Sequence, residues 1–119
     1  VTKSVCYHAA IMANEMKTTA IATLTNSGYT AYQISAWRPS AHILVFTSNK
    51  RILTQLNLLW GVKAFYYDSM VSTDQTISDL NEIARKAGYV TQGDTIINLA
   101  SMPLKEKGMV NTLRVSTIS

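Results

Sequence analysis

A turn rich in small polar residues is the part of this sequence best suited to binding chemistry. Positions 20–32, AIATLTNSGYTAY, read as a buried strand, a break at Thr25-Asn26-Ser27-Gly28, and the start of a helix. The first N–H groups of a helix have no intrahelical acceptor and lie at the positive end of its dipole. Such a turn suits a phosphate group, with hydroxyl donors from Thr25, Ser27 and Thr30. The alternative is purely structural, with Ser27 capping the helix and Gly28 keeping the turn compact.

A second loop is a candidate partner for this turn. It spans residues 101–108, SMPLKEKG, after the fourth apolar strand signal. Ligands of parallel α/β sheets gather beyond the carboxyl ends of the strands. If the first and fourth strands are neighbours, Lys105 or Lys107 can lean over a ligand in the turn; otherwise they are solvated charges. The candidate effector or phosphate site therefore comprises Thr25, Asn26, Ser27, Gly28, Thr30, Lys105, Lys107 and Gly108.

The sequence contains no arrangement of side chains typical of a catalytic or metal centre. His8 and His42 have no carboxylate or thiol at ligand spacing, and we interpret His42 as a partly buried, hydrogen-bonded residue. Cys6 is the only cysteine and is more typical of a packed thiol than of a nucleophile. The acidic residues form no pair suited to acid–base work, and we expect Asp79 and Glu82 on the outward face of a helix. We therefore expect no catalytic residue, metal ligand or cofactor in this chain.

The elements that must position the turn alternate between helix and strand. Apolar residues three or four apart predict a first helix that ends near Lys17. Ser48 or Asn49 caps a later helix, and Ser72 with Gln75 forms a capping box for the last one. The predicted order is a helix over 1–17, a strand over 20–24, a helix over 28–37, a strand over 42–46, a helix from the 48–49 cap that Gly61 stops, a strand over 62–67, a helix from 72 to 88 with Ile77, Leu80, Ala84 and Ala87 inward, and strands over 95–99 and 113–118.

Continuous apolar strands between helices predict a parallel sheet covered on both faces. The last strand alternates apolar and polar residues and follows its predecessor too closely for a crossover helix. The predicted fold class is therefore α/β, a three-layer α/β/α structure with a five-stranded, mostly parallel sheet whose C-terminal strand is antiparallel at the edge. An exposed edge strand can pair with its twin in another subunit. The expected oligomer interface is Thr112, Leu113, Arg114, Val115, Ser116, Thr117 and Ile118.

Length and composition limit the class of protein. With 119 residues and a hydrophobic fraction of 47%, the sequence predicts one globular domain. No apolar run approaches the roughly 20 residues that span a bilayer, and a single cysteine fits a reducing cytoplasm. We therefore expect a cytoplasmic protein with no membrane partner. The net charge of +4 comes from scattered Lys and Arg residues, so we expect no nucleic-acid partner either. The chain starts at Val1 without a helix cap or an initiator methionine, which suggests a domain excised from a longer protein.

Four segments of the chain resemble the C-terminal domain of pyruvate kinase. They are SVCYHAAIMANEMKTTAIATLTNSGYTAYQISAWRPSAHILVFT, LLWGVKAFYY, KAGYVTQGDTIINLAS and GMVNTLRV. The resemblance covers essentially the whole chain and keeps the order and spacing of the family. Its most specific pieces are Arg38-Pro39, Trp60-Gly61, Gly93-Asp94, and Asn111-Thr112 with Arg114-Val115.

This resemblance implies a glycolytic phosphotransferase that converts phosphoenolpyruvate and ADP to pyruvate and ATP. In the family, the catalytic groups, the magnesium and the potassium belong to a separate (β/α)8 barrel, so the resemblance implies that this fragment alone is inactive. The expected partners are the remainder of the pyruvate kinase chain, further copies in a tetramer, and an allosteric effector, often a sugar phosphate. The effector loop of sugar-bisphosphate-sensitive members resembles residues 25–30 but commonly carries basic residues in place of Asn26 and Tyr29. Their tryptophan and arginine after the third strand have no match between Asp68 and Arg85.

Three functions remain open at this point. The first is a regulatory and oligomerisation domain with a phosphate cradle at Thr25–Thr30, whose effector is a sugar phosphate or another phosphorylated compound. The second is a domain that serves assembly alone and has no effector site. The third is a free-standing α/β phosphate-binding protein, which the missing catalytic groups disfavour.

Overall fold

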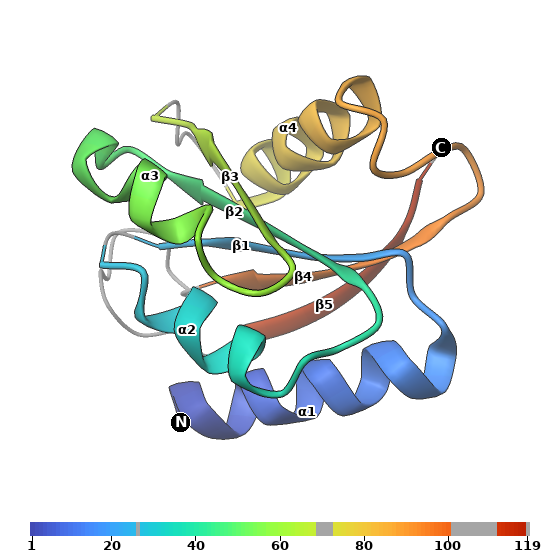
Figure 1. Ribbon diagram of the computed structural model, residues 1–119. Helices are drawn as coiled ribbons and strands as arrows, with labels where there is room; N and C mark the ends of the chain where they lie inside the picture. The colour runs from blue at the N-terminus through green and yellow to red at the C-terminus, as the bar shows by residue number, and fades with distance from the viewer. Residues whose placement is uncertain (26, 69–72, 101–111, 119) are drawn as a thin grey trace.

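The computed structural model describes residues 1–25, 27–68, 73–100 and 112–118, and its elements follow the predicted order (Figure 1). The elements are α1 (Thr2–Met16), β1 (Ala20–Leu24), α2 (Tyr29–Ala36), β2 (His42–Thr47), the 3-10 turn η1 (Lys50–Ile52), α3 (Leu53–Leu56), β3 (Val62–Tyr66), α4 (Thr73–Lys86), β4 (Thr95–Ala100) and β5 (Thr112–Thr117).

The five strands form one mixed sheet in the order β3-β2-β1-β4-β5. Strand β1 lies in the centre and runs parallel to both of its neighbours, with Ala22 opposite Leu44 of β2 and Asn98 of β4. Strand β3 is parallel to β2, whereas β5 is antiparallel to β4 and forms an edge. The predicted fold class, with its antiparallel C-terminal edge strand, is confirmed.

Helices cover both faces of the sheet, but unequally (Figure 1). Helices α1, α2 and α3 pack on one face, where they bury the side chains that point to that side of the central strands, such as Ile21 and Ile97. Helix α4 covers the other face alone, and its Leu80 and Ala84 pack in the core that contains Phe46. Because successive strand residues point to opposite faces, these apolar strands supply both cores.

The helices that follow β1 and β2 have bounds that differ from the prediction. Helix α2 starts at Tyr29 rather than Gly28, which has a left-handed backbone with φ of 87° and stands just before the helix. The helix after β2 begins as a 3-10 turn, and the side chain of Asn49 accepts the N–H of Arg51 at 3.1 Å, so Asn49 is a cap. It ends at Leu56, before Gly61.

Three further details of the sequence interpretation are wrong. Ala87 is exposed, because α4 has already ended at Lys86 and the chain turns at Gly88. His42 is exposed at the start of β2, where its ring packs edge-on against Tyr89 with 5.3 Å between centroids. Asp79 is half-buried and does not simply face solvent, because it accepts hydrogen bonds from Tyr67 and Gln75, both at 2.8 Å. The proposed capping box includes Ser72, which lies outside the described residues.

Candidate functional site

The Thr25–Thr30 turn lies at the carboxyl end of β1, in the middle of the sheet (Figure 1). From β1, the sheet extends through β2 and β3 on one side and through β4 and β5 on the other. In open α/β sheets, the crevice at such a switch in strand order is the usual place for a ligand. The first and fourth strands are neighbours, because β1 pairs with β4, so the condition set for the second loop is met. Asn26, Lys105, Lys107 and Gly108 of the candidate site lie outside the described residues.

Two hydroxyl groups organise the start of α2. The Oγ1 atom of Thr25 accepts the N–H of Gly28 at 2.9 Å, and the Oγ atom of Ser27 accepts the N–H of Tyr29 at 3.3 Å. Both hydroxyl oxygens act as acceptors here, so each keeps its own proton to donate. The expected Ser27 cap is wrong, because Gly28 occupies the N-cap position of α2 and Ser27 lies one residue before it. The turn still presents hydroxyl donors. Ser27 is exposed, Thr25 is half-buried, and Thr30 is buried.

Position 28 requires glycine for two reasons, the left-handed backbone conformation and the side chains that pack close to it. Its φ of 87° is a conformation that side chains with a Cβ atom rarely adopt. A Cβ atom added to Gly28 would lie 3.0 Å from Cδ2 of Leu56 and 3.6 Å from the ring of Tyr32. The turn is thus packed tightly onto α3, and its shape is set by neighbouring side chains as well as by its own sequence.

Several groups that could take part in covalent or acid–base chemistry are engaged in structural contacts. Burial raises the pKa of the Cys6 thiol to about 11, and its sulfur contacts the carbonyl of Thr30 at 4.0 Å. The Nδ1 atom of His8 lies 2.7 Å from the carbonyl of Ser4 on the same helix. Arg85 holds the pKa of Glu82 below its usual value through a hydrogen bond. Asp94 accepts the N–H of Thr91 at 2.8 Å in the turn before β4.

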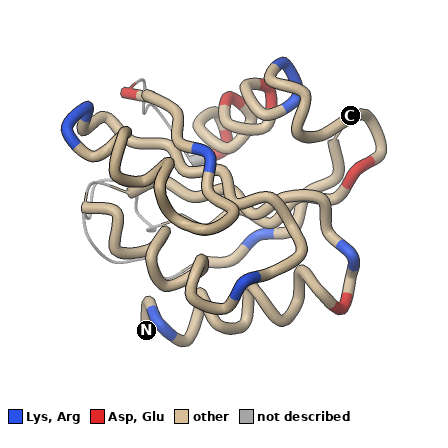
Figure 2. The backbone as a smooth tube through the Cα atoms, viewed as in Figure 1, with Lys and Arg blue, Asp and Glu red and all other residues tan. Residues whose placement is uncertain are grey.

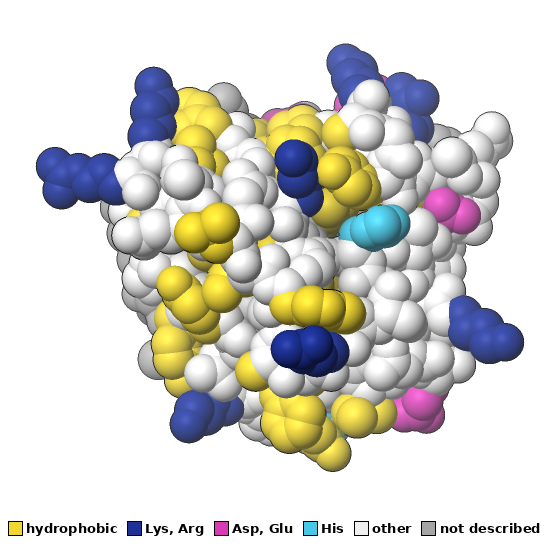
Figure 3. Space-filling view, in the orientation of Figure 1, with side chains coloured by type: hydrophobic (Ala, Val, Ile, Leu, Met, Phe, Trp, Pro, Cys, Tyr) yellow, Lys and Arg dark blue, Asp and Glu magenta, His cyan; other side chains and the backbone are white. Residues whose placement is uncertain are grey.

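No group of three or more His, Cys, Asp or Glu side chains that could hold a metal ion occurs among the described residues. Within the same part of the chain, no helix is long and apolar enough to cross a membrane. Figure 2 shows that Lys and Arg residues are spread around the described backbone and do not gather on one face. On the surface seen in Figure 3, hydrophobic side chains lie in several groups between polar areas, and Lys and Arg side chains lie both at the rim and in the middle of the face. These features are those of a domain without a concentrated basic surface.

The edge strand β5 presents a mixture of buried and exposed side chains. Val115 is 42% exposed, whereas Leu113 is half-buried against the core beneath α1 and α2. Ile118, just after the strand, is buried in the core under α4. Of the expected interface residues, those available at the surface are therefore mainly Arg114, Val115 and Thr117.

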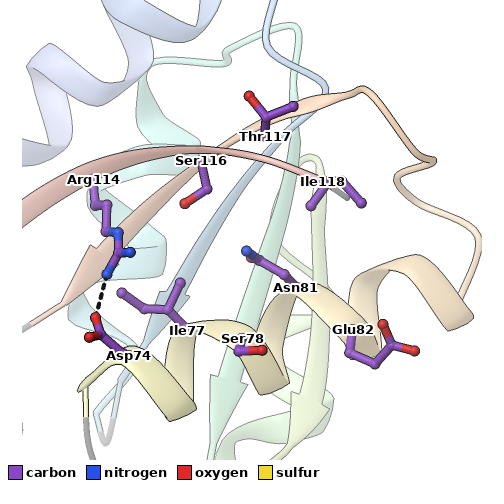
Figure 4. Close-up of a pocket in the computed structure, with 9 residues that line it drawn as sticks. All are labelled: Asp74, Ile77, Ser78, Asn81, Glu82, Arg114, Ser116, Thr117 and Ile118. Atoms are coloured by element: carbon purple, nitrogen blue, oxygen red, sulfur yellow. Dashed lines mark hydrogen bonds and ion pairs between the residues drawn. The ribbon is translucent and has the colours of Figure 1, made fainter.

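A polar groove between α4 and β5 was not predicted from the sequence. It has a volume of about 210 Å³, and it is lined mainly by Asp74, Ser78, Asn81, Arg114 and Ser116 (Figure 4). Asp74 and Arg114 are joined across it by an ion pair of 2.8 Å. The only hint in the sequence was the polar residue Asn98 within the apolar strand TIINLA, because a buried amide needs hydrogen-bonding partners.

Comparisons with known proteins agree on one family. The profile described as "Pyruvate kinase, alpha/beta domain" matches residues 3–116 of this chain. A pyruvate kinase of Clostridium acetobutylicum is 34% identical over 106 residues, which are 89% of this chain and 22% of that protein. One from Sporosarcina psychrophila is 31% identical over 117 residues, 98% of this chain and 20% of that protein. The chain thus spans about a fifth of the length of these relatives.

Proposed function

The chain belongs to the pyruvate kinase alpha/beta domain family, and on that premise we propose that it is the regulatory and assembly domain of a longer pyruvate kinase. In this proposal, the longer protein transfers a phosphoryl group from phosphoenolpyruvate to ADP. This domain makes no bond and breaks none; it binds a phosphorylated effector and helps to join the subunits of an oligomer.

The observation that carries the effector site is the hydroxyl arrangement at the Thr25–Thr30 turn. Thr25 and Ser27 accept backbone N–H groups and keep their own protons for a ligand. A phosphate oxygen that approaches the turn can receive these hydroxyl protons, or it can replace the hydroxyls as acceptor for the N–H groups of Gly28 and Tyr29. The site also lies at the positive end of α2, which favours an anion.

The turn should bind phosphate without strong selectivity of its own. No charged residue occurs between Thr25 and Thr30, so the contacts there lack the charge assistance of an arginine fork. Each charge-assisted hydrogen bond is worth about 1.5–3 kcal/mol, compared with about 1 kcal/mol for a neutral one. Additional charge from Lys105 or Lys107 would raise both affinity and selectivity for a phosphorylated sugar.

The chemistry of the longer protein is assigned to segments beyond this domain. Several of the described carboxylates are engaged in turns and ion pairs, such as Asp94 with Thr91 and Glu82 with Arg85. We therefore assign the magnesium and potassium of the reaction to the remainder of the enzyme, in a barrel domain. The longer protein should lose kinase activity when its barrel carboxylates are changed, and this domain alone should show no turnover.

A phosphate titration of the 119-residue chain tests the effector site. Amide resonances are followed by NMR as inorganic phosphate, and then fructose 1,6-bisphosphate, is added at constant ionic strength. We expect saturable shifts at Ser27, Gly28, Tyr29 and Thr30. The double variant Thr25→Val with Ser27→Ala should lose them, whereas Thr91→Val, which removes a hydroxyl in the turn before β4, should retain them.

Two results would contradict the effector site. The first is the absence of any shift at these four amides up to phosphate concentrations well above physiological levels. The second is an equal response in the double variant, which would assign the shifts to general ionic effects. Either result would leave the domain with assembly as its function.

Assembly alone is the second candidate, and the edge position of β5 favours it. The sheet ends at β5, whose Val115 is 42% exposed, so a second copy could extend the sheet across a two-fold axis. Sedimentation velocity of the 119-residue chain should then show a dimer that Val115→Lys weakens. A strict monomer at high concentration would contradict pairing through this edge.

A further inference from the structure

The 3-10 turn η1, which carries the exposed residue Arg51, lies beside the Thr25–Thr30 turn. Strands β1 and β2 run parallel, so the segments that follow them leave the same edge of the sheet. The N–H of Thr25 donates to the carbonyl of Phe46 at 3.0 Å and joins the ends of the two strands. Figure 2 shows the basic segment of η1 on the same side of the molecule as the start of α2. A cation on η1 is therefore a neighbour of any anion that the turn binds.

Apolar contacts hold η1 and α3 against the turn. A Cβ atom added to Gly28 would lie 3.9 Å from Cδ1 of Ile52 and 3.0 Å from Cδ2 of Leu56. Leu56 is buried in the core, and Ile52 packs against it. The start of η1 is fixed as well, because Oδ1 of Asn49 accepts the backbone N–H of Arg51 at 3.1 Å. The backbone that carries Arg51 thus has a defined position beside the turn.

The three residues of η1 point in different directions. A 3-10 helix has three residues per turn, so consecutive side chains are about 120° apart. Ile52 lies against Gly28, and the Nζ atom of Lys50 lies 4.9 Å from the centre of the Tyr66 ring on β3. Arg51 takes the remaining direction and is exposed. Its side chain is therefore directed neither into the core nor toward β3.

The two cations of η1 differ in the charges around them. The phenol of Tyr66, which lies under the ammonium of Lys50, donates to the carboxylate of Asp68 at 2.8 Å. Lys50 is thus held on the side of an acidic group. Among residues 1–25, 27–68, 73–100 and 112–118, no carboxylate forms an ion pair with Arg51. The guanidinium of Arg51 therefore keeps its N–H donors for an anion.

We propose that Arg51 determines the specificity of the phosphate site at the turn, an inference that rests on the function proposed above. Its guanidinium donates two parallel N–H groups to two oxygens of the phosphate, and a third oxygen accepts from the hydroxyl and backbone donors of the turn. The neutral turn fixes the position of the phosphate. Arg51 supplies the positive charge that the turn itself lacks, in a planar fork that matches two phosphate oxygens.

This division of contacts selects phosphate monoesters over diesters. A monoester has three unesterified oxygens, two for the guanidinium and one for the turn, and carries a charge of about −1.5 to −2 at pH 7. A diester has only two such oxygens and a single negative charge. It cannot satisfy both parts of the site, and its attraction to the guanidinium is weaker because the Coulomb energy scales with charge.

The test compares methyl phosphate with dimethyl phosphate. Each is titrated into the 119-residue chain at constant ionic strength, while NMR follows the amides of Gly28 and Tyr29 and the side-chain Nε–H of Arg51. We expect methyl phosphate to shift all three resonances with one dissociation constant, and dimethyl phosphate to bind at least about tenfold more weakly.

The outcomes separate this inference from the proposed effector site. Shifts of the Gly28 and Tyr29 amides without a shift of the Arg51 Nε–H would overturn the role of Arg51 and leave the phosphate site in place. Equal affinity for the two esters would overturn the selection of monoesters. The absence of shifts at all three groups would contradict the effector site and this inference together.

Variants separate the charge of Arg51 from its geometry. Arg51→Gln should weaken methyl phosphate binding by at least about tenfold, because it removes charge-assisted hydrogen bonds while keeping the backbone N–H that Asn49 accepts. Arg51→Lys keeps the charge but loses the planar fork, so its affinity should be intermediate. Lys86→Gln makes the same change in net charge at the exposed end of α4 and should bind as the unchanged chain does. Equal dissociation constants in Arg51→Gln and Lys86→Gln, both shown to be folded by circular dichroism, would overturn the proposal.

Discussion

The Thr25–Thr30 turn and the α4–β5 groove offer a ligand opposite kinds of chemistry. The turn presents hydroxyl and backbone groups and contains no charged residue. The groove presents a carboxylate and a guanidinium that lie 40 positions apart in the sequence. A neutral turn at a helix start carries only partial charges, whereas the groove carries a pair of full charges. The comparison shows that two polar features of one small sheet can differ in chemistry because one is built locally and the other through long-range contacts.

The largest expected effect is the loss of unfolding free energy in Gly28→Ala, to which backbone strain and crowded packing at the turn both contribute. Gly28→Ala should lower the free energy of unfolding by about 2–4 kcal/mol, because it adds left-handed strain of about 1–2 kcal/mol and a crowded contact with Leu56. Urea denaturation followed by circular dichroism measures the change. The variant should also lose phosphate binding at the turn.

Gly93→Ala is the matched control for that variant. Gly93 has a φ of 91°, but an added Cβ atom meets nothing within 4 Å. We expect a loss of only about 1–2 kcal/mol from backbone strain. Equal losses in the two variants would mean that contact with Leu56 does not shape the turn.

The next effect concerns the walls of the groove. Asn98→Ala should lower the free energy of unfolding by about 1–3 kcal/mol, because it leaves the amide of Asn81 and the hydroxyl of Ser116 without their buried partner. Ser116→Ala removes only its own hydrogen bond to Asn98 and should have a smaller effect. Thermal unfolding of both variants checks this order; a larger loss in Ser116→Ala would contradict the central role of Asn98.

A smaller change tests the two hydrogen bonds that the side chains of Thr25 and Ser27 accept in the turn. Thr25→Val keeps the shape of the side chain but removes the acceptor for the N–H of Gly28. We expect a loss of about 1 kcal/mol in unfolding free energy, a typical value for one hydrogen bond. Ser27→Ala should cost less, since its hydrogen bond is longer at 3.3 Å. Urea midpoints of the two variants measure the difference, and the reverse order would mean that the Ser27 hydrogen bond contributes more to the turn than the Thr25 hydrogen bond.

The smallest effect appears only at high pH and concerns the side of α4 away from the groove. Burial, and then the hydrogen bond to Asp79, raises the pKa of Tyr67 above its ordinary value of 10.0. The folded chain therefore keeps this phenol protonated to a higher pH than the unfolded chain does. The resulting stability is fully present below pH 10 and is lost as the pH rises through the folded pKa. Urea midpoints should fall less steeply above pH 10 in Tyr67→Phe than in the unchanged chain, and parallel curves would contradict this.

The sequence was sufficient to predict the sheet because its signals are local. The apolar runs at Ala20–Leu24 and Thr95–Ala100, the glycine at position 28 and the cap at Asn49 each report on a few neighbouring residues. The alternation of Leu113, Arg114 and Val115 was likewise enough to predict an edge strand. Such signals decide element type and order, but they do not measure how far each helix extends over the sheet.

Features that depend on tertiary contacts could not be predicted in this way. The exposure of His42 follows from the limited area that α4 covers, and the partners of Asp79 come from Tyr67 and Gln75. The ion pair of Asp74 and Arg114 requires that β5 lie beside α4, which periodicity alone does not give. For the same reason the hydroxyl of Thr25 was predicted only as a donor, and its use as the acceptor for the N–H of Gly28 was seen only in the structure.

The central position of β1 has a consequence for how the chain folds. Its residues pair with β2 on one side, but on the other side Ala20 lies opposite Ile96, near the far end of the described chain. Such pairings give a high contact order, and a large loop entropy must be lost before they form. We therefore expect slow refolding relative to helical bundles of similar size, with the β1–β4 ladder gaining hydrogen-exchange protection after the β1–β2 ladder.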